Sequence, residues 1–133
     1  MKPYEATSEE DFDSMMNVNL KGPFFLVQKA LPMLTKGSSI ILTSSIAGHK
    51  GNAMMAAYSA SKAAVISLGS TLGAYLADRC IRVNTISPGA IKTPIYGKVG
   101  MTKEAMDGMA ESFNQAIPMH RFEIGRASWR ERV

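Results

Sequence analysis

The sequence predicts an α/β fold, a partial doubly wound parallel sheet with about two strands and three helices. Residues 40–43 form a short apolar run without alternation, which is typical of a strand covered on both faces. Residues 81–86 are the second predicted strand, and a helix predicted for residues 56–77 separates the two. A strand, a helical crossover and another strand make a parallel unit, which is right-handed in nearly all known cases.

Two further helices are predicted on either side of this unit. The first begins near residue 8, because Thr7 or Ser8 can cap it and positions 10 and 11 place acidic side chains in its first turn. Its apolar residues follow a three- and four-residue spacing up to residue 34, and Gly-Pro at residues 22–23 predicts a kink. The other helix is rich in methionine, begins at residues 102–104 and fades near residue 116.

The composition is that of one modest globular domain. The chain has 133 residues, of which 46% are hydrophobic and 20% charged, and its mean hydropathy is −0.02. The longest uncharged run, residues 63–77, is shorter than the roughly 20 residues of a membrane span, so we expect no membrane association. There is no apolar leader and only one cysteine, Cys80, so we expect a cytoplasmic protein without disulfides.

The charge pattern argues against a nucleic-acid partner. The formal net charge is +4, but the basic residues are scattered, and only the end of the chain, residues 121–132, is densely basic. A nucleic-acid-binding protein usually presents a continuous basic face with interleaved aromatic residues. Two histidines and one cysteine also leave little material for a metal site, and we expect none.

Two strands are too few for a complete doubly wound domain. Since both predicted strands need neighbours that the sequence does not supply, we expect a C-terminal part of a larger domain in residues 1–122, with the N-terminal half missing. Residues 123–133 show neither helical nor alternating apolar spacing and resemble the translation of a sequencing adapter. We expect a non-native tail there, with a native basic tail as the alternative.

A tyrosine and a lysine lie four residues apart on the central predicted helix. Tyr58 and Lys62 therefore share a helix face, where a nearby ammonium is expected to favour the phenolate. Such a tyrosine can donate or accept a proton near neutral pH. Tyr75 and Arg79 repeat the spacing on the same helix, but they lie roughly 260° further round it and cannot serve the same site.

Polar or turn-forming residues follow both predicted strands. Ser44 and Ser45 come directly after the first, and Pro88-Gly89 follows the second. In open α/β sheets, ligands bind at the carboxyl ends of the strands. A lone serine pair after a strand is more often a helix or turn cap. Here, however, both strand ends and the Tyr58 face of the helix are expected to converge on one crevice, which predicts a binding site.

In these stretches the chain resembles the middle and C-terminal part of the NAD(P)-dependent short-chain dehydrogenase/reductase family, which implies a Rossmann-like fold. The resemblance covers residues 2–122 and rests on ordered motifs rather than on the tyrosine and lysine alone. The matching stretches are residues 17–22, 40–48, 58–62, 81–84 and 87–89, together with Thr93.

The resemblance implies a catalytic role for four residues. Tyr58 resembles the catalytic acid/base, and Lys62 resembles the residue that lowers the tyrosine pKa and bonds the nicotinamide ribose. Ser45, thirteen residues before Tyr58, resembles the serine that polarises the substrate carbonyl, with Ser44 as the rival. Asn19 resembles the asparagine that holds a water in a proton relay through Lys62.

The family pattern also implies a cofactor, a substrate and an assembly. Pro88, Gly89, Ile91 and Thr93 resemble the loop beside the nicotinamide of NAD or NADP. The substrate would be a small-molecule alcohol or carbonyl, interconverted by hydride transfer. The whole parent protein would be a homodimer or homotetramer, joined through the helices that carry Asn19 and Tyr58.

The sequence departs from the family at the pyrophosphate site. No two glycines are two residues apart, so the glycine fingerprint and the residue that selects NAD or NADP lie outside the chain. We therefore expect this polypeptide alone to be inactive. The alternative function is a non-catalytic binding or structural subunit of the same fold.

Overall fold

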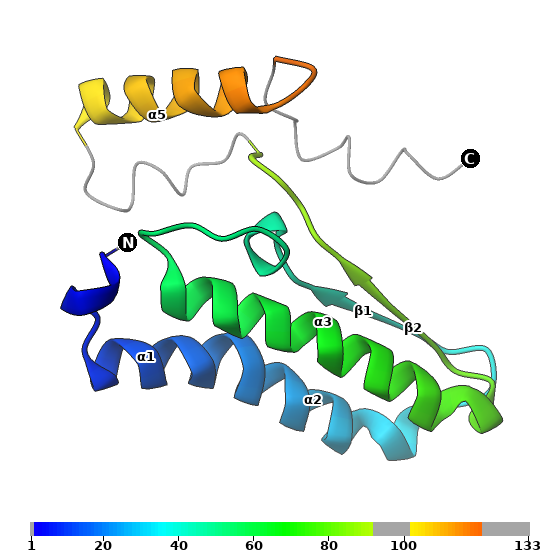
Figure 1. The fold of residues 1–133 in the computed structure, drawn as a ribbon. Helices are drawn as coiled ribbons and strands as arrows, with labels where there is room; N and C mark the ends of the chain where they lie inside the picture. The colour runs from blue at the N-terminus through cyan, green and yellow to red at the C-terminus, as the bar shows by residue number, and fades with distance from the viewer. Residues whose placement is uncertain (1, 92–101, 121–133) are drawn as a thin grey trace. The chain divides into compact units, whose positions relative to one another are not determined.

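The computed structural model describes residues 2–91 and 102–120 (Figure 1). It contains two compact units, Met1–Ser87 and Pro88–Val133, each of which is described by itself. The first unit holds the sheet and three of the helices. Thr93 and the predicted non-native tail lie outside the described residues.

The sheet of the first unit is a parallel pair. Strands β1 (Ser39–Thr43) and β2 (Arg82–Ile86) pair in register from Ser39 opposite Arg82 to Thr43 opposite Ile86. Helix α3 (Ala56–Leu76) and a short 3-10 turn (Ala77–Arg79) connect them. The predicted α/β class and parallel pairing are therefore confirmed, with strand bounds within one residue of those expected.

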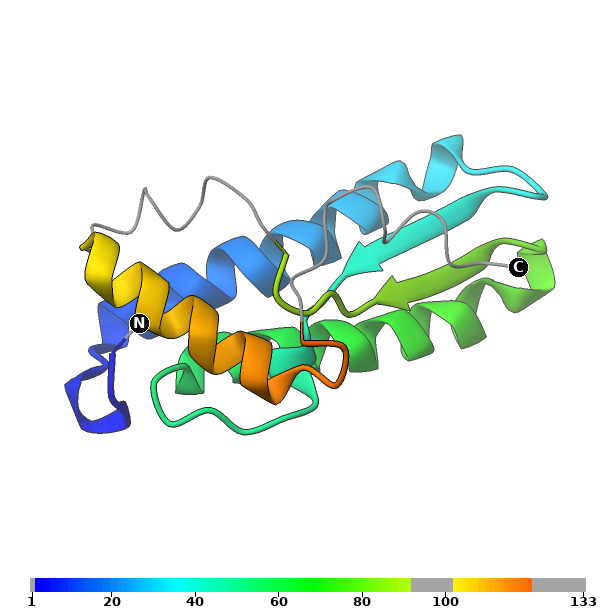
Figure 2. The same ribbon diagram turned by 90° about the horizontal axis from the view of Figure 1, so that it is seen from above.

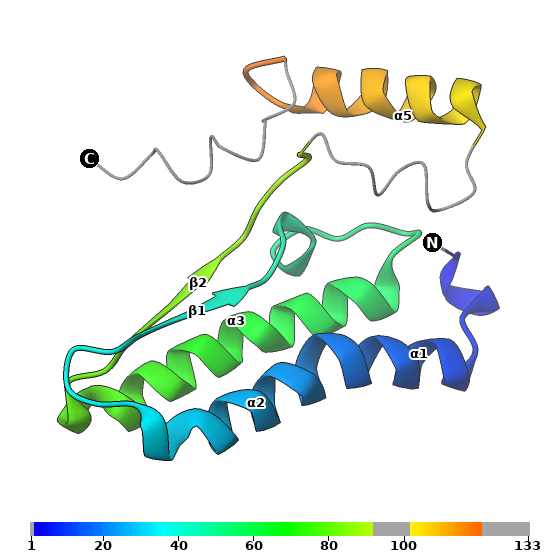
Figure 3. The same cartoon turned by 180° about the vertical axis from the view of Figure 1, so that it is seen from behind.

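Helices α1 (Glu9–Met16) and α2 (Gly22–Ala30) follow one another along α3, on the same side of the sheet (Figures 1 and 3). A π-helical turn (Asn17–Lys21) joins them, in which the Gly22 N–H donates to the Asn17 carbonyl. Pro23 has no N–H to offer the carbonyl four residues earlier, which explains why the helix widens just before it. The expected kink is thus a π-helical turn.

Ser8 caps the start of α1, which decides between the two caps, Thr7 and Ser8, that the sequence left open. The Asp11 N–H donates to the Ser8 hydroxyl, and the Asp11 carboxylate accepts from the Ser8 backbone in return. A hydrogen bond from the Lys2 ammonium, together with those from Ser8, lowers the pKa of Asp11 to about 2. A 3-10 turn (Tyr4–Ala6) precedes this cap.

The core lies between the helices and one face of the sheet. Val65 and Leu68 of α3 pack with Val27 of α2 and Leu42 of β1, and Leu76 is fully buried. From the sequence, the face of α3 with Val65, Leu68 and Leu76 was expected either to meet a second copy of the chain or to form core against the sheet. Their burial assigns these side chains to the core.

Within residues 2–87, the opposite face of the sheet is uncovered. Ile41 is 45% exposed and Ile86 is 39% exposed, whereas Ile40 and Leu42, which alternate with Ile41, turn toward the helices. The sequence predicted strands covered on both faces. Within residues 2–87, only one face is covered, as the view from above in Figure 2 shows.

Two contacts hold the helices close to their neighbours. A Cβ atom added at Gly69 of α3 would lie 2.0 Å from the Thr85 Oγ1 atom, so the helix can approach β2 this closely only with glycine there. At the far end, the Arg79 guanidinium donates to the carbonyls of Leu31 and Leu34, which follow α2. Tyr75, four residues before Arg79, is 68% exposed.

The second unit contains helix α5 (Lys103–Ala116), which matches the predicted methionine-rich helix within one residue. Pro88, Gly89 and Ile91 also belong to this unit. No helix among the described residues is long and apolar enough to cross a membrane. Within residues 2–91 and 102–120, no group of three or more metal-ligating side chains gathers.

Candidate active site

Tyr58 and Lys62 lie near the start of α3, one turn apart and both half-buried. The Lys62 Nζ atom is 5.7 Å from the centre of the Tyr58 ring. The same ammonium donates a hydrogen bond of 3.1 Å to the carbonyl of Thr43, the last residue of β1. Burial lowers the pKa of Lys62 below its usual 10.5, because the charged form loses hydration.

The two serines after β1 have different partners. Ser44 is 3% exposed, its hydroxyl donates to the Lys62 carbonyl at 2.7 Å, and its N–H donates to the Ile86 carbonyl. Ser45 is half-buried and its hydroxyl accepts from the Ala47 N–H at 3.2 Å. Ser44 therefore joins the end of β1 to α3 and β2, whereas the Ser45 hydroxyl keeps its own proton to donate.

Asn19 lies in the π-helical turn and reaches α3 through a serine that the sequence did not single out. The Asn19 side-chain amide donates to the Ser61 hydroxyl at 3.1 Å, and Ser61 donates to the Tyr58 carbonyl at 2.7 Å. Ser61 is completely buried. Among the hydrogen bonds of the described residues, Asn19 is thus linked to the Tyr58 turn, not to the Lys62 ammonium.

A glycine also shapes the site. The 3-10 turn Ile46–Gly48 follows Ser45, and a Cβ atom added at Gly48 would lie 2.9 Å from backbone atoms of Lys62 and Ala63. The turn after β1 therefore rests directly on the α3 backbone at the lysine. The family-like stretch 40–48 contained this glycine, but a contact with α3 could not be read from it.

Four of the predicted residues, Asn19, Ser45, Tyr58 and Lys62, belong to the first unit. Lys62 bonds the last residue of β1, and Ser45 follows that strand by two residues. Tyr58 lies one turn before Lys62 on α3, and Asn19 bonds Ser61 of that turn. Pro88, Gly89 and Ile91 belong to the second unit, and Thr93 lies outside the described residues.

The donors at this strand end suit the sugar and carbonyl part of a nicotinamide-dependent reaction. A phenol, an ammonium and a serine hydroxyl can together donate to ribose hydroxyls and to a carbonyl oxygen. The Lys62 ammonium has one hydrogen bond among the described residues, to Thr43, and an ammonium can make three. The residues present therefore fit the nicotinamide-ribose end of such a cofactor, but they include no glycine loop for its pyrophosphate.

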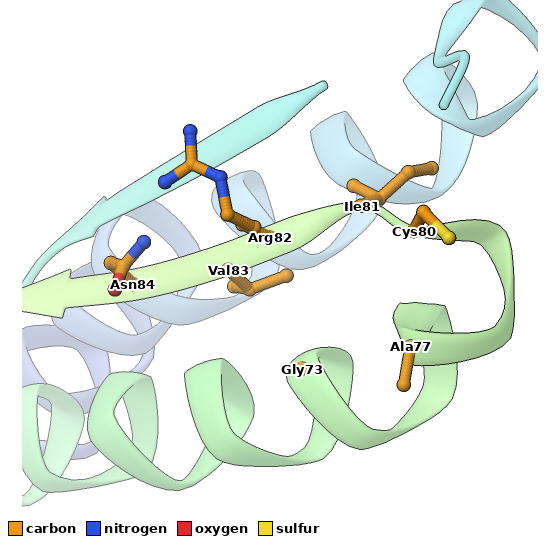
Figure 4. Close-up of a pocket in the computed structure, with 7 residues that line it drawn as sticks. All are labelled: Gly73, Ala77, Cys80, Ile81, Arg82, Val83 and Asn84. Carbon is orange, nitrogen blue, oxygen red and sulfur yellow. The ribbon is translucent and has the colours of Figure 1, made fainter. Parts of the chain in front are cut away.

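A separate hollow lies at the other end of α3. It has a volume of about 600 Å³, and none of the predicted site residues lines it. Figure 4 shows it between the last turns of α3 and the start of β2. The lining residues are Gly73, Ala77, Cys80, Ile81, Arg82, Val83 and Asn84.

Comparison with known proteins identifies the family. Residues 1–127 match a family model described as enoyl-(acyl carrier protein) reductase. The chain belongs to the short-chain dehydrogenase/reductase family. The 3-oxoacyl-acyl-carrier-protein reductase of Thermotoga maritima is 41% identical over 116 residues, which cover 86% of this chain and 45% of that protein.

Solved structures of the short-chain dehydrogenase/reductase family share the fold. A family member from Brucella melitensis, titled a glucose/ribitol dehydrogenase, matches with a TM-score of 0.81 and 32% identity, over 92% of this chain and 47% of that one. NAD⁺-bound xylitol dehydrogenase matches with a TM-score of 0.75 and 30% identity, over 92% of this chain and 52% of that one. The chain thus spans about half the length of these relatives, and the Rossmann-like fold class is confirmed.

Proposed function

We propose that residues 1–122 are the C-terminal part of a longer Rossmann-like domain that interconverts an alcohol and a carbonyl with NAD or NADP. The observation that carries this proposal is the half-buried Tyr58–Lys62 pair at the end of β1, with Ser45 on the same strand end. The match to about half of each relative and the uncovered face of the sheet support the longer domain.

In the proposed reaction, Tyr58 supplies the proton and Ser45 orients the oxygen. The Ser45 hydroxyl donates to the carbonyl oxygen of a small-molecule substrate and stabilises the charge that develops there. The Tyr58 hydroxyl gives its proton to that oxygen in reduction and takes it back in oxidation. A bound nicotinamide would supply or accept the hydride.

Lys62 and Asn19 would act on the surroundings of Tyr58. The Lys62 ammonium stabilises the phenolate and donates to the nicotinamide ribose, while the Thr43 carbonyl fixes its direction. Asn19 is proposed to hold the proton-relay water, and its bond to Ser61 fixes its side chain against the Tyr58 turn. Pro88, Gly89, Ile91 and Thr93 are proposed to bind the nicotinamide side of the cofactor.

The test is Tyr58→Phe in the longer protein. Because the substitution removes only the proton donor, turnover should fall by about 10²- to 10⁴-fold while cofactor binding changes little. Tyr75→Phe is the matched control, since Tyr75 has the same spacing to a basic residue but is exposed on another face of α3. Equal turnover in the two variants would remove Tyr58 from the mechanism and favour a non-catalytic subunit.

We also propose a homodimer or homotetramer for the longer protein, with α2 and the π-helical turn before it at the interface. Val18 and Leu26 are each at least 70% exposed, and Phe24 and Phe25 lie between them with more than two-fifths of each exposed. Burying such side chains between copies is favourable. Light scattering that shows a monomer would contradict this assembly.

A further inference from the structure

His49 and Ser87 form a hydrogen bond between the two segments that leave the sheet at its carboxyl edge. The His49 Nε2 and Ser87 Oγ atoms are 3.0 Å apart. His49 directly follows the 3-10 turn after β1, and Ser87 directly follows β2. The bond therefore joins the segments that follow β1 and β2. It lies further along the chain than the hydrogen bond from the Ser44 N–H to the carbonyl of Ile86, the last residue of β2.

The His49 end of this link is attached to the candidate active site. The His49 N–H donates to the Ile46 carbonyl at 3.0 Å, and the Gly48 N–H donates to the Ser45 carbonyl at 2.9 Å. Gly48 in turn rests on the backbone of α3 at Lys62. The imidazole thus projects from a short turn that begins at Ser45 and is fixed against the lysine.

The Ser87 end leads into the proposed cofactor segment. Ser87 is half-buried, and Pro88 and Gly89 follow it directly in the chain. Residues beyond a strand have no ladder hydrogen bonds to fix them, so a side-chain bond at this point restricts where the following segment begins.

We infer that His49 is a positioning residue for cofactor binding: through Ser87 it fixes the point at which the chain leaves β2, directly before the segment proposed to bind the cofactor. This inference rests on the proposed function. A serine and a histidine can also form a nucleophile and base, but that arrangement needs a third group that orients the imidazole. Among the hydrogen bonds of the described residues, the only side-chain partner of the His49 imidazole is Ser87.

The experiment compares His49→Ala, Ser87→Ala, the double variant and His49→Gln in the longer protein. The dissociation constant of NADH and NADPH is measured by fluorescence titration, and KM and kcat by steady-state kinetics. Each alanine variant should weaken cofactor binding and raise the cofactor KM about fivefold, because one hydrogen bond contributes about 1 kcal/mol. The kcat should stay within about twofold of that of the unchanged protein.

The remaining variants separate a specific bond from general damage. The double variant should bind no more weakly than the weaker single variant, because both changes remove the same bond. His49→Gln should restore binding, since its amide can donate at similar reach. His120→Gln, which alters the chain's other histidine, should leave the dissociation constant unchanged.

The inference would be overturned if His49→Ala left cofactor binding unchanged. It would also be overturned if the losses of binding in the two alanine variants were additive in the double variant. Binding is measured without turnover, so this failure is distinct from failure of the proposed function. The latter would show as turnover that survives Tyr58→Phe.

Discussion

Lys62 illustrates, at the scale of one residue, how the candidate site and the stability of the fold conflict. Its ammonium is half-buried beside the Tyr58 ring, and one carbonyl, that of Thr43, accepts a hydrogen bond from it. Burial disfavours the charged form and lowers its pKa. The position that suits catalysis therefore costs the folded state free energy.

We predict that Lys62→Met abolishes turnover and makes the longer protein at least as stable as the unchanged protein at pH 7. The folded-state pKa of Lys62 lies below the unfolded value of 10.5, so between these two values the unfolded chain binds more protons. Stability of the unchanged protein should therefore rise with pH across that window. The advantage of the methionine variant should shrink correspondingly.

Thermal unfolding followed from pH 7 to pH 10.5 measures this difference. Lys29→Met, on an exposed position of α2, is the matched control and should show no such trend. A Lys62→Met protein that is clearly less stable at pH 7 would show that the bond to Thr43 outweighs the cost of burial.

Residue patterns predicted the reactive side chains of the candidate site better than the residues that hold them in place. The four-residue spacing on a helix is local, so the shared face of Tyr58 and Lys62 followed from the sequence. Ser61 and Gly48 were missed because their importance depends on distant partners: Asn19 lies 42 residues from Ser61, and Gly48 contacts the backbone of α3. Nothing near either residue in the sequence indicates those contacts.

At the scale of the elements, local signals predicted the bounds of both strands, α3 and α5 to within one residue. The cap at Ser8 and the break at Pro23 are also local features, and both were found. The sequence left two surroundings open for Gly69, a closely approaching helix or the sheet. It lies against Thr85 of β2, so the second alternative holds. The surroundings of a residue on α3 depend on which side of the helix the sheet lies.

Gly69 and Gly73, one turn apart on α3, should respond oppositely to alanine. A Cβ atom at Gly69 would overlap Thr85, so Gly69→Ala should destabilise the first unit by about 1–3 kcal/mol. A Cβ atom at Gly73 meets nothing within 4 Å, so Gly73→Ala should stabilise it by about 0.5–1 kcal/mol through helix propensity. Urea denaturation of both variants of the longer protein measures the difference.

Thr85→Ala provides a rescue for the Gly69 prediction. It removes the Oγ1 atom that the added Cβ would meet, so it should recover part of the stability lost in Gly69→Ala. If Gly69→Ala and Gly73→Ala have the same effect, the close approach of α3 to β2 does not limit what position 69 accepts.

At the scale of the whole molecule, the uncovered sheet face determines how this 133-residue polypeptide should behave alone. Ile41 and Ile86 are exposed on that face, and within residues 2–87 the two paired strands leave both outer edges of the sheet unpaired. The chain also has no glycine loop to hold a pyrophosphate. The sequence predicted strands covered on both faces because an unbroken apolar strand is typical of such a sheet, and within residues 2–87 one face is covered.

We therefore predict that the isolated polypeptide shows no measurable NAD(P)H-dependent reduction and associates in solution. The first expectation follows from the lack of a pyrophosphate site, since catalysis requires the cofactor to be held in a fixed orientation. Absorbance assays with carbonyl substrates and size-exclusion chromatography with light scattering measure the two properties. A monomeric, cooperatively folding preparation with steady-state turnover would contradict both.

The two glycine contacts of α3 have a mechanical consequence for Tyr58. Gly48 supports the helix at Lys62, and Gly69 meets β2 seven residues later, about 10 Å along the axis. Tyr58 projects about 6 Å beyond the first support. If α3 is rigid and rotates about its contact at Lys62, moving Gly69 about 1 Å away from β2 displaces Tyr58 by about 0.6 Å in the opposite direction. The spacing between α3 and β2 at Gly69 can thus set the position of a phenol that lies eleven residues earlier on the same helix.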